Sequence, residues 1–203
     1  MKKGTIILLV VLAILVGVGI AIYSMFASAY NGAVERDVAV NQQWANVENV
    51  YQRRMDLIPN LIATVKGAAD FEKSTLTSVI EARAKATQVT LKAGEGSAPT
   101  EADKQAFIQA QSELSSSLSR LLVSVERYPQ LQATQQFRDL MVQLEGSENR
   151  ISVERRKYNA TVGEYNVFVR RFPNNILMGM FGFSPRTEFK AEAGAEKAPK
   201  VEF

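Results

Sequence analysis

Residues Gly4–Val34 form a stretch of 31 residues without a charged side chain. Its centre, Ile6–Ile22, consists almost entirely of Ile, Leu, Val, Ala and Gly. A helix rises about 1.5 Å per residue, so roughly 20 apolar residues cross the hydrocarbon core of a bilayer. Such a helix satisfies its backbone polar groups internally. The sequence therefore predicts a transmembrane anchor over residues 1–29, followed by a polar domain.

The same stretch also resembles a removable signal peptide. Lys2 and Lys3 precede it, and Ala27-Ser28-Ala29 is a small-x-small triplet of the kind that signal peptidase cleaves. Its apolar core is longer than the roughly 7–15 residues of such a leader, which favours an uncleaved anchor. The two lysines before the span, against the net negative Glu35-Arg36-Asp37 after it, favour a cytoplasmic N-terminus with the domain outside.

Small residues repeat every four positions on one face of the anchor, at Ala13, Gly17 and Ala21. This spacing lets two membrane helices pack closely, and homo-oligomerisation through this face is therefore one interpretation. The other is that small residues are simply common in membrane helices.

Composition excludes several classes of function. The chain has 203 residues, with 24 Lys and Arg, 21 Asp and Glu, no Cys and no His. Beyond Val34 the balance is 22 basic against 21 acidic residues, which gives no electrostatic footprint for nucleic acid. Without Cys or His the chain has no thiol nucleophile, no thiolate metal ligand and no imidazole base. We therefore expect no enzyme, no metal and no cofactor, and carboxylates such as Glu48 and Glu148 lack the histidines of a di-metal centre.

After the anchor, apolar residues recur at alternating steps of four and three, which is typical of coiled coils and helical bundles. The first series is Tyr30, Val34, Asp37, Asn41, Trp44, Glu48, Tyr51, Met55, Ile58, Ile62 and Val65. Helices are predicted at about 30–69, 72–91, 100–128 and 131–172, with a cap at Thr100 and a kink where Pro59 interrupts the first. Two long and two short helices predict an all-α, elongated, up-down-up-down four-helix bundle over residues 30–183.

Polar residues stand at apolar positions of both long helices. With the two helices antiparallel and Tyr30 opposite Phe172, Glu48 falls against Arg155 and Arg54 against Glu148. We expect two inter-helix ion pairs, which either specify the register of the helices or mark a functional site.

The segment that follows the bundle is apolar and then turns polar. Ile176, Leu177, Phe181 and Phe183 either cap the end of the bundle or contact the headgroup region of a membrane. Residues 184–203 are rich in Ala, Glu, Lys and Pro and lack periodicity, so a disordered tail is predicted there.

Several blocks resemble the LemA family of bacterial membrane proteins. They are Tyr30-Asn31, Gln43-Trp44, Arg53-Arg54-Met55-Asp56-Leu57-Ile58-Pro59-Asn60-Leu61, Val65-Lys66-Gly67, Ala82-Arg83, Glu126-Arg127-Tyr128-Pro129, Glu148-Asn149-Arg150-Ile151, Arg155, Tyr158-Asn159, Tyr165-Asn166, Phe172-Pro173 and Asn175-Ile176. The resemblance implies an N-terminal anchor in the plasma membrane and a long helical bundle. The opposite orientation has also been proposed for the family. Little about biochemistry follows from it.

Two functions fit these observations. The first is a non-enzymatic membrane-anchored scaffold that binds protein partners in the cell envelope. Its candidate partner site is Arg53, Arg54, Asp56 and Asn60 around Pro59, although these residues can equally tie the kink to neighbouring helices. The alternative is a membrane-active or self-assembling protein that acts on the bilayer through residues 176–183.

Overall fold

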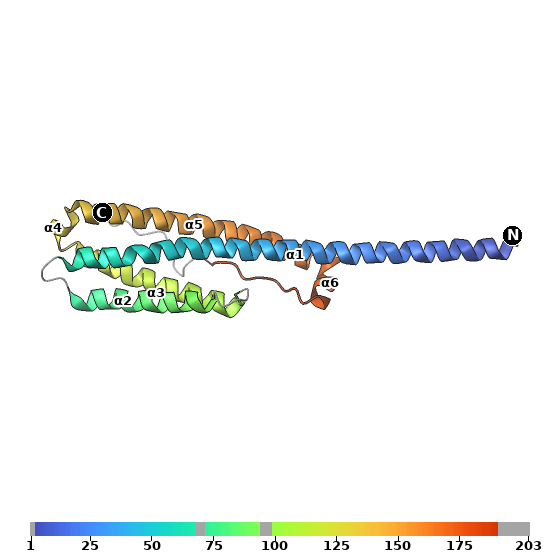
Figure 1. Cartoon of the computed structure of the whole chain (residues 1–203), viewed down its shortest axis with the longest axis horizontal. Coiled ribbons are helices and arrows are strands. Elements are labelled where there is room, and N and C mark those ends of the chain that lie inside the picture. The colour runs from blue at the N-terminus through green and yellow to red at the C-terminus, as the bar shows by residue number, and fades with distance from the viewer. Residues whose placement is uncertain (1–2, 68–71, 94–98, 191–203) are drawn as a thin grey trace, which may run out of the picture. The chain divides into compact units, whose positions relative to one another are not determined.

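The computed structural model describes residues 3–67, 72–93 and 99–190. In this part of the chain the regular structure is entirely helical, which confirms the predicted all-α class (Figure 1). The helices are α1 (Lys3–Lys66), α2 (Lys73–Ala93), α3 (Glu101–Val125), α4 (Pro129–Gln132), α5 (Gln135–Arg170) and α6 (Asn174–Met180). They divide between two compact units. The first contains residues 3–40 and Ala160–Glu188, and the second contains Asn41–Asn159 and residues 189–190.

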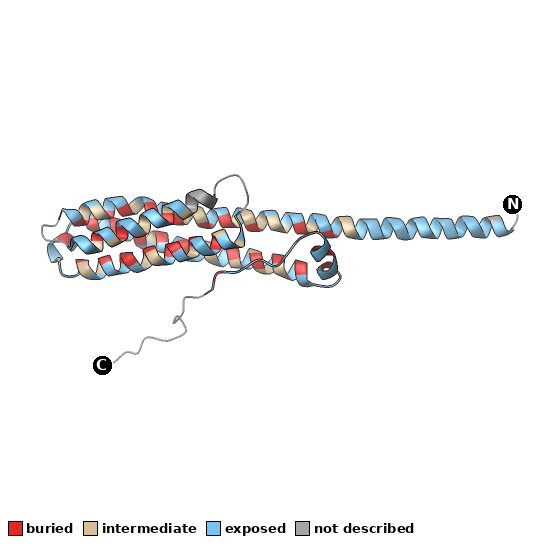
Figure 2. Cartoon of the chain, turned by 90° about the horizontal axis from the view of Figure 1, so that it is seen from below, coloured by how far each residue is buried: buried red, intermediate tan, exposed pale blue. Residues whose placement is uncertain are grey.

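α1 contains the uncharged stretch and remains helical through Ser28–Asn31, where a break would have separated the anchor from the domain. Within the described residues it is the helix that is long and apolar enough to cross a membrane. Its most apolar 18-residue window has a mean hydropathy of 3.1, and none of that window is buried. Figure 2 shows this part of α1 as exposed along its length. Such a surface fits a lipid environment and indicates membrane association.

In the first unit, α5 approaches α1 closely beside small residues. Ala29 and Ala33 are buried, and Gly32 stands between them. A Cβ atom at Gly32 would lie 2.9 Å from Cζ of Phe168, which is too close for a real contact. The Arg36 guanidinium lies over the Phe168 ring, 4.3 Å from its centroid, in a cation–π contact. Gly32 is therefore what allows the Phe168 ring to lie against α1.

α6 ends in a turn that directs two aromatic rings back onto α1. Gly182 adopts a positive φ of 78°, and the Phe183 N–H donates to the Met178 carbonyl at 3.0 Å, as in a Schellman-type helix end. The rings of Phe181 and Phe183 then meet Tyr30 edge-on, with centroids 5.2 and 5.9 Å apart. This part of the segment therefore packs on α1 within the first unit.

A hydrophobic core in the second unit contains buried side chains from five helices. Its members are Met55, Ile58, Leu61, Val65, Leu76, Val79, Ala86, Ala110, Leu114, Leu118, Leu121, Val125, Leu131, Phe137 and Leu144. Burying a side chain of this kind contributes about 1.5–3 kcal/mol, so this core dominates the stability of the unit. On α1, Leu61 is fully buried whereas the predicted position Ile62 is only partly buried.

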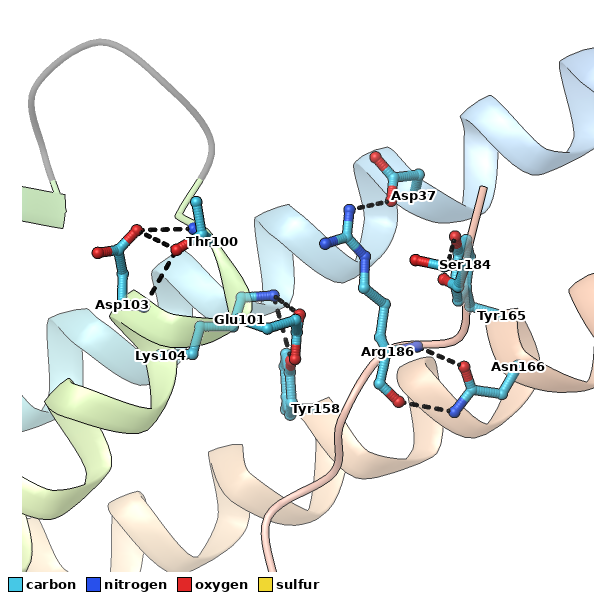
Figure 3. Close-up of polar contacts among 10 residues, drawn as sticks. All are labelled: Asp37, Thr100, Glu101, Asp103, Lys104, Tyr158, Tyr165, Asn166, Ser184 and Arg186. Atoms are coloured by element: carbon cyan, nitrogen blue, oxygen red, sulfur yellow. Dashed lines mark hydrogen bonds and ion pairs between the residues drawn. The ribbon is translucent and has the colours of Figure 1, made fainter. Parts of the chain in front are cut away.

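Most helix ends lie near their predicted positions. Thr100 caps α3, because its Oγ1 accepts from the Asp103 N–H at 3.2 Å while the Asp103 carboxylate accepts from the Thr100 N–H at 2.9 Å (Figure 3). α5 continues through Gly146 and Ser147 as the unbroken phase predicted. The fourth predicted helix is divided, since α4 is a separate turn before α5 begins at Gln135. Pro59 lies inside α1, and the kink there stays a prediction.

Residues 184–190 differ from the predicted disordered tail. They form no helix or strand, but they make specific contacts in both units. In the first unit the Tyr165 hydroxyl donates to the Ser184 carbonyl at 3.0 Å, and Arg186 pairs with Asp37 at 2.8 Å (Figure 3). In the second unit Phe189 is buried. Residues 191–203 of the predicted tail lie outside the described residues.

Candidate functional site

A buried arginine lies at the centre of the second unit. Arg54 is 3% exposed, and its Nη1 donates to Glu148 Oε2 at 3.0 Å and to Ser115 Oγ at 2.9 Å. Its Nη2 donates to Gln111 Oε1 at 2.8 Å. The structure thus brings together Arg54 of α1 and Glu148 of α5, as the antiparallel register predicts. Charge-assisted bonds of this kind compensate the cost of burying a guanidinium.

Arg54 lines a groove of about 430 Å³ that the second unit leaves open to solvent. The groove is basic on balance, because Arg155 and Lys190 line it together with Arg54, against the one carboxylate of Glu148. Its remaining walls are Tyr51, Gln105, Ile108, Gln111, Ser112 and Ser115. The serine hydroxyls and glutamine carboxamides of these walls can donate hydrogen bonds to polar groups and accept hydrogen bonds from them.

The second predicted ion pair, Glu48 with Arg155, is wrong. Arg155 Nη2 instead donates to the Lys190 carbonyl at 3.1 Å, and its guanidinium lies 4.9 Å from the Phe189 ring centroid. Burial raises the pKa of Glu48, while the Trp44 indole N–H and the Lys104 ammonium act in the opposite direction. The pair fails because residues 189–190, predicted to be disordered, engage Arg155.

Sequence reasoning also missed Lys104, a lysine that is 2% exposed in the second unit. Its Nζ lies 3.2 Å from Glu101 Oε1 and 3.4 Å from the Tyr158 hydroxyl (Figure 3). It also lies 5.4 Å from the Trp44 ring centroid, within cation–π range. Lysine is almost never buried unless it is paired, and here the partners include the Glu101 carboxylate, the Tyr158 hydroxyl and the Trp44 ring.

An aromatic cluster surrounds this lysine. The Trp44 ring meets Phe107 and Tyr158 edge-on at 5.5 and 5.4 Å and stacks on Phe189 at 5.8 Å with an interplanar angle of 14°. Asn159 holds the backbone of Phe189, since its Oδ1 accepts from the Phe189 N–H at 2.8 Å and its Nδ2 donates to the Phe189 carbonyl at 2.9 Å. The sequence signal that could have indicated this contact is the repeat of Tyr-Asn at Tyr158-Asn159 and Tyr165-Asn166.

The four predicted partner-site residues do not form one site. Arg53 and Asp56 line a hollow of about 260 Å³ together with Arg150, whereas Arg54 faces the groove described above. Asn60 is exposed and lines neither. Of the four residues, the structure thus brings only Arg53 and Asp56 to one hollow, and their role in partner binding stays a prediction.

The predicted membrane-contact residues point in different directions in the first unit. Leu177 is buried, Phe181 and Phe183 are half-buried, and Ile176 is exposed. Two further apolar side chains are 78% and 71% exposed, namely Phe172, which precedes the predicted segment 176–183, and Met180, which lies inside it. The segment therefore both packs on α1 and leaves an apolar surface open.

No group of three or more acidic, cysteine or histidine residues that could hold a metal ion occurs within residues 3–67, 72–93 and 99–190.

A family model described as the LemA family matches residues 43–203. Two relatives from Paramagnetospirillum magneticum, magnetosome proteins MamQ 2 and MamQ 1, are each 27% identical over 196 residues, which cover 90% of this chain and 72% of the relative. Magnetosome protein MamQ of Magnetospirillum gryphiswaldense is 26% identical over the same shares of both chains.

Proposed function

Because the chain belongs to the LemA family, we propose that it is a non-enzymatic scaffold, anchored in the bacterial plasma membrane, that binds protein partners in the cell envelope. The observation that carries this proposal is the composition of α1. The same helix contains the exposed apolar window and the buried core residues Met55, Ile58 and Leu61. A chain built in this way holds a folded domain at a membrane through a helix that belongs to that domain.

We assign the domain to a four-helix bundle of α1, α2, α3 and α5. Support comes from the core of the second unit, to which each of these helices contributes buried side chains. Arg54 and Lys104, which are 3% and 2% exposed, are both held by protein groups. This arrangement suits a structural role, because groups of the same chain compensate both charges. The relatives are magnetosome proteins by name, and for this chain we carry over the membrane association alone.

Partner binding is assigned to the hollow that Arg53, Asp56 and Arg150 line. To test it, a photo-crosslinking amino acid replaces Arg53 in the full chain, in native membranes, and crosslinked proteins are identified by mass spectrometry. The matched control places the same amino acid at Ser116, an exposed position on α3. We expect a discrete protein at Arg53 that is absent at Ser116. If neither position captures a discrete protein, the proposal that this hollow binds a protein partner is wrong.

The orientation of the domain needs a separate experiment. The chain has no cysteine, so Ser116→Cys creates a single labelling site on the domain. We expect a membrane-impermeant maleimide to label this variant in spheroplasts without lysis, because the domain lies outside the cytoplasm. Labelling that requires lysis would place the domain in the cytoplasm and reverse the orientation.

A second function, direct contact with the bilayer, has its own support in the first unit. Phe172, Ile176 and Met180 are 78%, 58% and 71% exposed. The neighbouring Phe181 packs on Phe26 and Tyr30 of α1, with ring centroids 6.2 and 5.2 Å apart. The exposed residues therefore lie in the same unit as the C-terminal end of the apolar span, where Phe and Met favour the membrane interface.

A spin label measures this contact in the full chain. The variant Met180→Cys carries a nitroxide in nanodiscs, and Asn175→Cys, an exposed position on the same helix, is the control. We expect oxygen to relax the label at position 180 more strongly than a water-soluble nickel chelate does, with the opposite order at position 175. Equal accessibility to the chelate at both positions would exclude lipid contact.

A further inference from the structure

Phe189 is bound in the second unit as a peptide ligand is bound. Asn159 pairs with both backbone groups of this one residue, the N–H at 2.8 Å and the carbonyl at 2.9 Å. The N–H and the carbonyl of one residue point to the same side when the backbone is extended, as in the paired residues of a β-ladder. A carboxamide has one acceptor and one donor edge that match this pair of groups. Asn159 therefore acts like a neighbouring strand toward an extended backbone.

The side chain of Phe189 enters a site that is fully built from the domain. Trp44 and Tyr158 form its walls, and both are themselves buried. The Tyr158 ring meets the Phe189 ring edge-on, with centroids 5.3 Å apart, whereas the Trp44 ring stacks on it face to face. Arg155 lies over the same ring and also binds the next carbonyl, that of Lys190. These contacts select an aromatic residue in an extended segment, which is recognition of both backbone and side chain.

The same chemistry recurs in the first unit, seven residues along α5. Asn166 accepts from the Arg186 N–H at 2.8 Å and donates to the Arg186 carbonyl at 3.0 Å (Figure 3). Asn159 and Asn166, each of which follows a tyrosine, therefore bind the N–H and the carbonyl of one backbone residue in the same way. The repetition indicates that binding an extended backbone is a property of this helix rather than an accident of one contact.

We propose that Asn159, Trp44, Tyr158 and Arg155 form a peptide-binding site for an extended segment that carries a phenylalanine. The chain's own Phe189 occupies this site in cis, and the Phe189 segment of a second copy occupies it in trans. A second copy is the occupant because its segment is identical to the one that already fits. Residues 187–190 have no helix or strand that would hold them in place. Exchange of an identical element between copies is a low-cost route to association.

Two features of the exchange follow from its chemistry. The cis segment competes with any segment in trans through its high local concentration, so exchange becomes appreciable when chains are crowded in one membrane. The site itself depends on the contacts within the second unit and operates whether or not the chain is a scaffold.

The first test supplies the segment as a free peptide. The full-length variant Phe189→Ala in detergent micelles is titrated with the capped five-residue peptide of residues 186–190, Arg-Thr-Glu-Phe-Lys. Trp44 is the single tryptophan of the chain, so its fluorescence reports on the site directly. We expect saturable binding that restores the wild-type emission. A peptide with an N-methyl group on the Phe nitrogen should bind about tenfold more weakly, because it cannot donate to Asn159.

Absence of saturable binding, with helicity intact by circular dichroism, would overturn the proposal, as would equal affinity of the N-methyl peptide.

The second test does not depend on the stability of Phe189→Ala. Two differently tagged full chains are co-expressed, one with Ser152→Cys, an exposed position on α5 one turn from Arg155, and the other with Lys190→Cys, and their membranes are treated with a short bis-maleimide. The control pairs Lys190→Cys with Ser116→Cys, which lies on α3.

We expect a mixed-tag dimer from the first pair that the five-residue peptide suppresses, and none from the control pair. A chain with both Ser152→Cys and Lys190→Cys provides the internal standard, since it crosslinks within itself when the cis segment is bound. Internal crosslinking without any mixed-tag dimer would show that a second copy does not occupy the site.

Discussion

Arg54 and Glu148 are 94 positions apart in the chain, yet Nη1 of the arginine lies 3.0 Å from Oε2 of the glutamate. The two partners have unequal environments, because Arg54 is 3% exposed whereas Glu148 is 62% exposed. Arg54 also has Gln111 and Ser115 as partners, so its contribution exceeds that of the ion pair alone.

We therefore expect Arg54→Ala to lower the free energy of unfolding by about 2–4 kcal/mol, since it leaves a void and removes the donor that Gln111 Oε1 accepts from. Glu148→Ala should cost about 1 kcal/mol, because solvent screens the exposed half of the pair. Urea unfolding of the full chain in detergent, followed by circular dichroism, measures both. Arg53→Ala, an exposed neighbour, is the control and should change stability by less than about 0.5 kcal/mol. Equal losses for Arg54→Ala and Glu148→Ala would contradict the unequal burial.

Heptad phase was sufficient to place Arg54 opposite Glu148. Phase fixes which residues of two antiparallel helices lie at the same level, and it also explained why α5 continues through Gly146. Heptad phase does not show which other groups of the chain bind a side chain at that level. Glu48 and Arg155 have the same predicted register, but Arg155 binds the Lys190 carbonyl and the Phe189 ring instead.

The contacts of residues 184–190 could not be predicted from periodicity because they join side chains to an irregular backbone. Asn159 and Asn166 bind N–H and carbonyl groups, which every residue possesses, so the composition of the bound segment carries no sign of the contact. Its Ala, Glu, Lys and Pro content is typical of disorder. The one local signal was the Tyr-Asn repeat on α5, which periodicity explained only through its two tyrosines.

Gly32 and Gly163 provide a matched pair for testing how closely α1 and α5 approach. Both lie inside helices, where Gly→Ala alone stabilises by about 0.5–1 kcal/mol. A Cβ atom at Gly163 meets nothing within 4 Å, whereas one at Gly32 would lie 2.9 Å from Phe168 Cζ. We expect Gly163→Ala to stabilise the protein and Gly32→Ala to destabilise it by about 1 kcal/mol, because the Phe168 ring must move.

Thermal unfolding of the two variants in the same detergent distinguishes these effects. The variant Phe168→Leu combined with Gly32→Ala should recover part of the lost stability, since a smaller side chain leaves room for the new methyl group. If Gly32→Ala stabilises the protein as much as Gly163→Ala does, the two helices do not approach closely at this point.

The pH dependence of stability should report on the environment of Glu48. Burial raises its pKa above the ordinary value of 4.5, so the folded state holds this proton more tightly than the unfolded state does. The contribution of Glu48 to stability is therefore greatest below pH 4.5 and is lost as the pH rises through the raised folded pKa. We expect Glu48→Gln to gain stability relative to wild type between pH 4 and pH 7, as measured by urea unfolding at both pH values.

Glu154 is the control for Glu48, because its pKa is shifted in the opposite direction. The Lys157 ammonium, with a smaller effect from the Gln43 amide, holds the pKa of Glu154 below 4.5. The stability from this group is present above pH 4.5 and is lost as the pH falls through the lowered folded pKa. Glu154→Gln should therefore lose stability relative to wild type as the pH rises from 4 to 7. The same pH trend for both variants would mean that Glu48 is not in a desolvated environment.

The hold of Asn166 on Arg186 can be measured by proteolysis of one peptide bond. Trypsin must detach Arg186 from its partners before it can cleave after this residue, and these partners are the Asn166 amide and the Asp37 carboxylate. Asn166→Ala removes two backbone hydrogen bonds and should raise the cleavage rate about tenfold or more, because each bond contributes about 1 kcal/mol to the closed state. Asp37→Asn removes a partly exposed ion pair and should have a smaller effect. Mass spectrometry quantifies cleavage of the bond after Arg186. Asn175→Ala, at an exposed position, is the control variant. If Asn166→Ala is cleaved no faster than Asn175→Ala, Asn166 does not hold the segment that contains Arg186.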